Sequence, residues 1–397
     1  MDRFTVTTRV FHAPHNDRRL VAKEFVPRRV ATSTVPQEGR AITLLFVHAT
    51  GFHKELWEPT LEAMSLDSSE AASAAARATP AEKASGNGPT GQECVSYSNT
   101  NGHSSIMVKP TLASHLYPTG AWYVDRIVTF DCFNHGDSAV LNKDRLGNKL
   151  TWTSIAHDII DITEQIRSNS TMVGVGHSFG ASSLLIAQLL RPDIFDAIFA
   201  VEPVLAFAEG FHGHKYELTL RRRAVWNSKA HAIKYFTKHP FFATWDQRVL
   251  QIFLRHGLSP ATAAAQITKA EGKGNDTVAT ATATAATTTT AVQLKCQPRD
   301  EYETYMGGWV DSVRTIDNMS EIICPTRFLL GELSSVCPNS KYAQSYASSC
   351  LLSDARVAKD LGHLIPMESP ETVAYQLGLF LSDHLVLNTG LQFRSRL

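Results

Sequence analysis

Short apolar runs separated by amphipathic stretches make up most of the chain. Two apolar segments, residues 4–11 and 20–26, flank the turn-forming sequence PHNDRR, which predicts an antiparallel hairpin. Further runs typical of strands lie at residues 41–47, 127–130, 173–175, 194–201, 327–330 and 355–358. Helical patterns cover residues 152–166 and 181–190, between these runs. Strands that alternate with helices predict a mostly parallel sheet with helices on both faces.

Two segments interrupt this alternation. Residues 67–118 are rich in Ser, Ala, Gly, Asn and Thr, and residues 259–291 include a Thr/Ala low-complexity run. Such compositions bury too little apolar surface to offset the entropy of ordering, so we expect mobile surface insertions. Residues 204–319 are mainly helical in pattern and carry no strand signal, which predicts a helical lid. The core would then consist of two parts, residues 1–203 and 320–394.

Composition excludes several classes of function. The chain has 397 residues, and Lys plus Arg equals Asp plus Glu at 38 each, so no net field would attract nucleic acid or a membrane surface. No window approaches the roughly 18 apolar residues that a membrane-spanning helix needs. The six cysteines lack C-x-x-C or zinc-type spacing, which predicts reduced thiols in an intracellular protein. The sequence indicates no metal and no cofactor.

The pentapeptide GHSFG, residues 176–180, is the strongest chemical signal. It follows the apolar run at 172–175 and precedes the small and apolar stretch at 181–190. A strand, a sharp turn and a helix in this order form a nucleophile elbow, in which glycines avoid contact with neighbouring backbone. We therefore expect Ser178 to be a catalytic nucleophile; the alternative is a glycine-bounded turn with an ordinary serine.

A serine nucleophile needs a base, and the base needs an acid that fixes its tautomer. After an elbow the expected chain order is serine, acid, histidine. His363 follows the strand candidate at 355–358 in the sequence LGHLIPMESPE, which is where this topology brings a histidine to the site. A histidine on an ordinary surface loop is the alternative.

The acid is less obvious from the sequence. The usual aspartate position after the strand at 327–330 is filled by Ser334 or Ser335, and we expect Glu332 to point away from the site. Glu202 directly follows the strand candidate at 194–201. It therefore lies at the carboxyl end of a strand, which is where ligands bind in parallel sheets. We therefore favour Glu202 over Glu332 as the acid. A buried ion pair at the base of the lid is the alternative role for Glu202.

Acyl transfer also requires donors for the developing oxyanion. We expect one from the backbone N–H of Phe179, directly after the nucleophile. The other should come from the loop HATGF after the strand at 41–47, where Thr50 is the preferred donor and Gly51 the next. We expect His48 to be structural and the loop DCFNHGDS, residues 131–138, to support the elbow by hydrogen bonds.

Positive charge is concentrated in the predicted lid. Residues 211–240 contain seven Lys and Arg side chains and one acid, Glu217. Arg221, Arg222 and Arg223 could clamp the phosphates of coenzyme A, because arginine binds phosphate in a bidentate manner. A solvated helix face explains the same cluster equally well. Aromatic residues nearby fit either an acyl-chain pocket or the core of the lid.

Ser395, Arg396 and Leu397 form a conservative variant of the S-K-L tripeptide read by the peroxisomal import receptor. The tripeptide carries little information, and coincidence is the alternative. We expect peroxisomal targeting.

With HATGFHKELWEP, GHSFG, AVEP, FFATWDQRVLQIFLRHGL and the tripeptide SRL, the chain resembles the fungal peroxisomal α/β-hydrolases. The resemblance omits residues 67–118 and 259–291. It implies an α/β-hydrolase fold, with a mostly parallel eight-stranded sheet and a helical lid after strand 6. By resemblance, Ser178, Glu202 and His363 match the group's serine, acid and histidine.

The resemblance implies hydrolysis of an acyl thioester or ester in peroxisomes, in fungal secondary metabolism such as toxin biosynthesis. The two expected substrates are an acyl-CoA, cleaved by a thioesterase, and an oxygen ester, cleaved by a lipase or carboxylesterase with the same triad. Epoxide hydrolases share the scaffold but use a carboxylate nucleophile, so Ser178 argues against that class. A non-catalytic protein that kept the fold is the remaining alternative.

Overall fold

The computed structural model describes residues 1–28, 39–77, 94–98, 121–145, 150–205, 213–261, 290–336, 343 and 345–385. The low-complexity run within 259–291 and the tripeptide Ser395–Leu397 lie outside the described residues. No helix of the described part is both long and apolar enough to cross a membrane.

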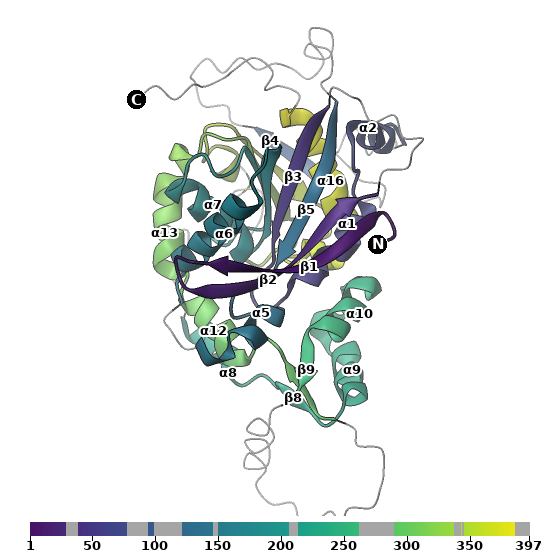
Figure 1. The fold of residues 1–397 in the computed structure, drawn as a ribbon, viewed down its shortest axis with the longest axis vertical. Helices are drawn as coiled ribbons and strands as arrows, with labels where there is room; N and C mark the ends of the chain where they lie inside the picture. The colour runs from purple at the N-terminus through teal and green to yellow at the C-terminus, as the bar shows by residue number, and fades with distance from the viewer. Residues whose placement is uncertain are drawn as a thin grey trace, which may run out of the picture.

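A nine-stranded sheet forms the centre of the molecule, in the order β1-β2-β5-β3-β6-β7-β11-β12-β4 (Figure 1). The strands are β1 (Phe4–Ala13), β2 (Arg18–Pro27), β3 (Arg40–Val47), β4 (Cys94–Ser98), β5 (Trp122–Phe130), β6 (Thr171–His177), β7 (Ala197–Val201), β11 (Thr326–Gly331) and β12 (Ser353–Ala358). The six strands from β5 to β12 in this order run parallel, whereas β1, β2 and β4 pair antiparallel. The expected hairpin and the mostly parallel sheet are thus confirmed.

The ninth strand was not predicted. β4 pairs antiparallel with β12 at one edge of the sheet, and it comes from the segment 67–118 that we expected to be an insertion outside the sheet. Helix α2 (Ser68–Arg77) also lies in this segment. The segment's small and polar composition obscured both elements, so the sequence indicated only eight strands.

The central strands are apolar without interruption because helices cover both of their faces. Every residue of β7 is buried, and so are most residues of β3 and β6. One core packs α6 (Trp152–Ile166) and α7 (Phe179–Leu190) on one face, and another packs α1 (Glu58–Ala63) and α16 (Pro370–Leu385) on the other (Figure 1).

The described helices within residues 204–319 are α8 (Gly213–Leu220), α9 (Lys229–Lys238), α10 (Gln247–His256), α12 (Pro298–Met306) and α13 (Trp309–Asn318). All of these except α13 lie below the central sheet in Figure 1. An aromatic cluster that includes Phe236, Phe242 and Phe253 of this segment packs against Phe52 and Leu56 of the core. The last helix, α13, packs on α7 and so belongs with the core.

The expectation of a lid without strands is wrong. A small antiparallel sheet of β8 (Val225–Trp226), β10 (Val292–Leu294) and β9 (Leu258–Pro260) joins its helices. Strands of two or three residues are too short to show an alternating pattern, so their sequences carried no signal.

Candidate active site

Ser178 occupies the turn between β6 and α7 in a conformation that few residues adopt. Its φ is 55° and its ψ is −124°, in the region that normally favours glycine. The glycines at both ends permit this turn. A Cβ on Gly176 would lie 2.6 Å from the Cα of Ala181, and a Cβ on Gly180 would lie 2.5 Å from the carbonyl oxygen of His48. Only glycine fits at these positions without a shift of backbone.

Ser178, His363 and Glu202 lie in one chain of hydrogen bonds. The Ser178 Oγ is 2.9 Å from His363 Nε2, and His363 Nδ1 is 2.8 Å from Glu202 Oε2. His363 lies on the loop after β12, and Glu202 follows directly after β7. Glu202 is fully buried, whereas the His363 side chain is 19% exposed. The His363 ring is thus held from behind by the buried Glu202 carboxylate and faces the Ser178 hydroxyl.

Glu202 is held by more than the histidine. Its backbone has a φ of 49°, and its Oε1 accepts a 2.6 Å hydrogen bond from the Gly331 N–H. Its Oε2 accepts a 2.5 Å hydrogen bond from Ser334 Oγ. Ser334 therefore fills the position where an aspartate was expected and supports the carboxylate on the neighbouring strand. The sequence did not predict this contact between Ser334 and Glu202.

Glu332, the alternative acid, lies away from the histidine. Its Oε2 accepts a hydrogen bond from the Asp360 N–H at 3.0 Å, in an exposed position. The structure brings Glu202, and not Glu332, to His363.

His177 positions the loop that carries the base. Its Nε2 lies 2.9 Å from the backbone oxygen of His363 and donates to it, since a carbonyl can only accept. Burial and the nearby His363 ring lower the pKa of His177 to about 3, so this imidazole is neutral at physiological pH. His177, the second residue of the pentapeptide, thus holds the backbone of His363 in place.

The two expected oxyanion donors line the same cavity as Ser178. The Phe179 N–H belongs to the first turn of α7, where a helix leaves its N–H groups without an internal partner. On the other loop, the Gly51 N–H donates a 2.9 Å hydrogen bond to His135 Nε2. Burial lowers the pKa of His135, which keeps its imidazole neutral and able to accept. Gly51 is therefore engaged with His135, whereas Thr50, the preferred donor from the sequence, lines the cavity together with Ser178.

A buried charge network supports the oxyanion loop. Asp131 accepts hydrogen bonds from the Lys54 backbone N–H at 2.8 Å and from Lys54 Nζ at 2.7 Å. The same ammonium group lies 2.7 Å from Asp137 and 3.0 Å from Glu55. Lys54 is 1% exposed, so its charge is balanced by these carboxylates rather than by water.

His48 has a structural environment. The Cys132 N–H donates to its Nε2 at 3.0 Å, and its Nδ1 lies 2.8 Å from the Ala49 carbonyl. Burial lowers the pKa of His48 to about 4, which keeps the ring neutral. These contacts agree with the supporting role expected for His48 and for the loop at 131–138.

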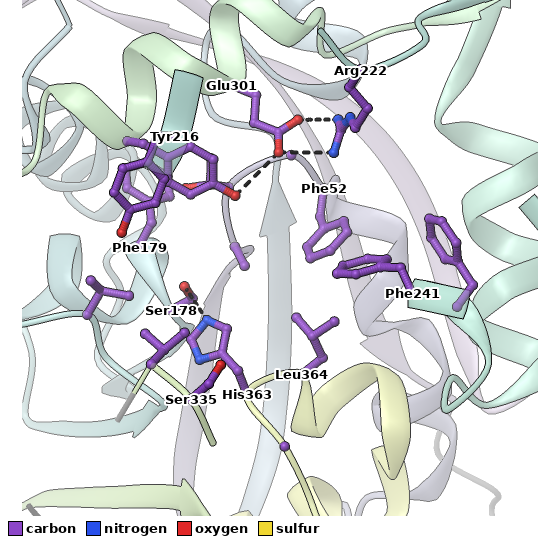
Figure 2. Close-up of a pocket in the computed structure, with 18 of the residues that line it drawn as sticks. Phe52, Ser178, Phe179, Tyr216, Arg222, Phe241, Glu301, Ser335, His363 and Leu364 are labelled. Carbon is purple, nitrogen blue, oxygen red and sulfur yellow. Dashed lines mark hydrogen bonds and ion pairs between the residues drawn. The ribbon is translucent and has the colours of Figure 1, made fainter. Parts of the chain in front are cut away.

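The site opens into a cavity of about 840 Å³. Aromatic side chains dominate the lining: Phe52, Trp152, Phe236, Phe241, Phe242 and Phe253. In Figure 2, Ser178 and His363 lie on one side of the cavity, and Phe52 and Phe241 face them across it. A cavity of this size and lining can hold an acyl group of moderate length.

Two of the three candidate phosphate-binding arginines reach the cavity. Arg222 and Arg223 line it, whereas Arg221 is exposed and is not among the lining residues. Arg222 forms a bidentate ion pair with Glu301. The Arg223 guanidinium lies 5.6 Å from the ring of Trp226 and 5.7 Å from that of Tyr235, and its Nε donates to the Val225 carbonyl. The sequence did not predict the Arg222–Glu301 pair, because Arg222 follows α8 and Glu301 lies on α12, far along the chain.

The sequence is similar, at low identity, to several fungal proteins. It is 24% identical over 295 residues to "Peroxisomal membrane protein LPX1" of Saccharomyces cerevisiae, covering 69% of this chain and 70% of that protein. It is 23% identical over 179 residues to "Type I acyl-CoA thioesterase mpaH" of Penicillium brevicompactum, which covers 43% of this chain and 41% of the other. It is 23% identical over 225 residues to "Abhydrolase domain-containing protein ACTT2-1" of Alternaria alternata, which covers 51% and 80%.

The fold is also similar to that of the yeast protein. The crystal structure of the yeast peroxisomal alpha-beta-hydrolase Lpx1 superposes with a TM-score of 0.69 at 18% identity, covering all of this chain and 93% of that one. A family model described as "Alpha/beta hydrolase family" matches residues 44–376, which include the elbow, the lid and the histidine loop. The chain belongs to the alpha/beta hydrolase family.

Proposed function

We propose that this protein is a serine hydrolase in which Ser178 is the nucleophile, His363 the general base and Glu202 the acid. One observation carries the proposal: the hydrogen-bonded chain from Ser178 Oγ through the His363 ring to Glu202, which opens into a cavity large enough for an acyl group. A serine hydrolase requires hydrogen-bond distances between its nucleophile and its base and between its base and its acid.

In the acylation step His363 Nε2 takes the proton of Ser178 as Oγ attacks the acyl carbon. The carbonyl oxygen becomes an oxyanion and is stabilised by the N–H groups of Thr50 and Phe179. Collapse of the tetrahedral intermediate breaks the bond to the leaving group, which receives the proton from His363. Glu202 stays ionised and stabilises the imidazolium while it exists. Water then repeats the sequence on the acyl-serine, releasing the acid and restoring the serine.

We assign an acyl thioester of coenzyme A as the first substrate class. The name of the Penicillium relative supports this choice. Arg223, which lines the cavity, and the exposed Arg221 nearby in the sequence are available for the phosphates of such a leaving group. Arg222 contributes less to this part of the proposal because Glu301 already neutralises it. We also propose import into peroxisomes and a role in fungal secondary metabolism, supported by the names of the yeast relative and by the Alternaria similarity.

A panel of acyl-CoA thioesters and simple esters of matched chain length tests the substrate class. Release of free thiol or alcohol is measured for the wild-type protein and for Ser178→Ala. We expect Ser178→Ala to abolish release while the protein remains folded; unchanged release would contradict the triad. Higher kcat/KM on esters, with no effect of Arg221→Ala or Arg223→Ala, would favour a lipase or carboxylesterase instead.

Two further measurements address the other parts of the proposal. A fluorophosphonate probe should label wild-type protein at Ser178 and leave Ser178→Ala unlabelled; absence of label on the wild type would support the non-catalytic alternative. A fluorescent fusion in a fungal cell should enter peroxisomes and become cytosolic when Ser395, Arg396 and Leu397 are deleted. Import that survives the deletion would contradict the targeting role of the tripeptide.

A further inference from the structure

A charged pair lies among the many aromatic residues that line the cavity. Arg222 Nη1 donates to Glu301 Oε1 at 3.1 Å, and Arg222 Nη2 donates to Glu301 Oε2. The Glu301 side chain is 5% exposed, whereas that of Arg222 is 42% exposed. In Figure 2 the pair lies across the cavity from His363 and faces into the same space as Ser178.

The pair lies close to the reaction centre. A Cβ built on Gly51 would be 3.1 Å from the carboxyl carbon of Glu301, and Gly51 directly follows the expected oxyanion donor Thr50. Glu301 is therefore in contact with the oxyanion loop itself. A substrate acylating Ser178 has its reacting carbonyl beside this loop, so its acyl group passes near the pair.

The pair keeps unused hydrogen-bonding capacity. Glu301 Oε1 accepts from Arg222 and, at 3.3 Å, from the Tyr305 hydroxyl, whereas among the described residues Oε2 accepts from Arg222 alone. One further bond to Oε2 is therefore open. On Arg222 the Nε–H and the second N–H of each terminal nitrogen have no partner within the described part of the chain. The pair offers an acceptor beside several donors.

Three kinds of acyl group would meet this pair differently. A plain alkyl chain would displace water from the pair without replacing the hydrogen bonds that the water makes, and this loss raises the free energy of the charged groups. A carboxylate would add one negative charge to a pair that is already neutral. A hydroxyl group can donate to Glu301 Oε2 and accept from Arg222 at the same time, without changing the charge balance.

We propose that the Arg222–Glu301 pair binds a hydroxyl group on the acyl chain of the substrate and thereby selects hydroxylated acyl groups. This inference rests on the proposed function, because it assumes that the cavity holds an acyl group bound for Ser178. It adds the chemical class of that group. The pair acts as a specificity determinant and takes no part in bond breaking.

A purely structural role for the pair is the competing explanation. Arg222 follows α8 and Glu301 lies on α12, so the pair also connects two parts of the lid. Exchanging both members for apolar side chains of similar size often leaves stability unchanged or improves it. The double variant Arg222→Met/Glu301→Leu is therefore a suitable test, since it removes recognition without leaving a lone buried charge.

The substrates form a series on one acyl thioester or ester of fixed chain length, whichever the wild type hydrolyses. The series contains the unsubstituted chain, the chain with a hydroxyl at each successive carbon, and the chain with a terminal carboxylate. For the wild type we expect kcat/KM to rise about tenfold to a hundredfold for one hydroxyl position, which is the range for hydrogen bonds to charged groups. In Arg222→Met/Glu301→Leu this ratio should fall to near one.

Matched variants separate recognition from general damage. Arg248→Met/Glu371→Leu removes an ion pair that is outside the cavity lining, and the hydroxyl preference should survive in it. Glu301→Gln keeps the size of the side chain but removes its charge, so we expect preference to move from the hydroxyl to the carboxylate. Glu301→Gln also provides a readout if the apolar double variant does not fold.

The possible results have separate meanings. Equal rates for all members of the series in the wild type would overturn the inference and leave the serine hydrolase intact. A wild-type preference for the carboxylate would overturn it too, because Arg222 would then release Glu301 for an anion. Persistence of the hydroxyl preference in Arg222→Met/Glu301→Leu would assign recognition elsewhere. Absence of both hydrolysis and fluorophosphonate labelling would remove the proposed function, and the inference with it.

Discussion

Ser334 Oγ donates a 2.5 Å hydrogen bond to Glu202 Oε2, the same oxygen that lies 2.8 Å from His363 Nδ1. The serine occupies the loop after β11, and the glutamate follows β7 on the neighbouring strand. The carboxylate and the serine thus meet behind the histidine from two adjacent strands. The carboxylate beside His363 follows β7 instead of β11, where the sequence pattern led us to look for an aspartate. The loop after β11 supplies a hydrogen-bond donor, Ser334, in its place.

This arrangement predicts that the acid can be moved back. Glu202→Ala should lower kcat/KM by about 10³- to 10⁴-fold, because the histidine loses the group that fixes its tautomer. Adding Ser334→Asp to Glu202→Ala places a carboxylate on the other strand, beside His363, and should recover at least about tenfold of the loss. Steady-state hydrolysis of one good substrate measures both effects. No recovery in the double variant would mean that the loop after β11 cannot direct a carboxylate to the histidine.

Ser334→Ala is the milder test of the same contact. It removes one hydrogen bond to a buried carboxylate, so kcat should fall by about tenfold with little change in KM. Ser335→Ala serves as a neighbour control, since no hydrogen bond joins Ser335 to Glu202 within the described part of the chain. An equal loss in both variants would indicate general damage to the loop.

Strand and helix positions followed from apolar patterns because burial on both sheet faces forces continuous apolar runs. α6 begins and ends at the predicted residues, and β3, β6 and β11 extend their predicted runs by only a few residues. The elbow was recognisable because strand, turn and helix are contiguous in the sequence. The proximity of Ser178 to His363 followed only from the chain order of serine, acid and histidine that is expected after an elbow, since no local pattern joins residues so far apart.

The features that escaped prediction are contacts between distant segments. Arg222 and Glu301 are separated by 79 positions, and no periodic pattern reports such a pair. Ser334 looked like an absent acid because its partner lies on another strand. β8, β9 and β10 were too short to show alternation, and they form because β10 pairs with both β8 and β9 and because Trp226, Leu258 and Leu294 are buried in a shared core.

Glycine geometry at the elbow predicts opposite effects for two alanine substitutions. In Gly180→Ala the new Cβ would lie 2.5 Å from the His48 carbonyl oxygen and 2.6 Å from that of Val47, and backbone cannot move aside cheaply. We expect a loss of several kcal/mol in unfolding free energy, about 3 or more. In Gly378→Ala, within α16, the nearest atoms are 3.8 Å away, and removing a helical glycine should stabilise by about 1 kcal/mol. Thermal unfolding compares the two; a stable Gly180→Ala would show that the elbow can open.

Buried histidines predict a loss of stability in mild acid. Burial lowers the pKa of His177 to about 3 and that of His48 to about 4, whereas an unfolded histidine titrates near 6.5. The folded state therefore binds fewer protons, so the stabilisation is complete above pH of about 6.5 and is lost as pH falls toward the folded values. Each such histidine should reduce the unfolding free energy by about 1.4 kcal/mol per pH unit in this window.

His177→Gln tests this dependence, because an amide nitrogen can still donate to the His363 carbonyl but does not titrate. Urea denaturation at a series of pH values from 7 to 4.5 measures the slope. In His177→Gln the change of unfolding free energy with pH should be smaller by the contribution of one proton, about 1.4 kcal/mol per pH unit. An unchanged slope would mean that His177 does not limit acid stability.

The buried ammonium of Lys54 predicts the largest effect of any charge substitution in the oxyanion loop. Lys54→Met would leave Asp131 and Glu55 buried without their shared cation, which should cost about 3–5 kcal/mol of unfolding free energy. Arg191 is the exposed control: it pairs with Glu164 at 2.7 Å and its side chain is 49% exposed, so Arg191→Met should cost about 1 kcal/mol or less. Chemical denaturation measures both variants. Equal losses of unfolding free energy in the two variants would show that water reaches Lys54. Burial would then no longer explain why the nearby His48 is neutral.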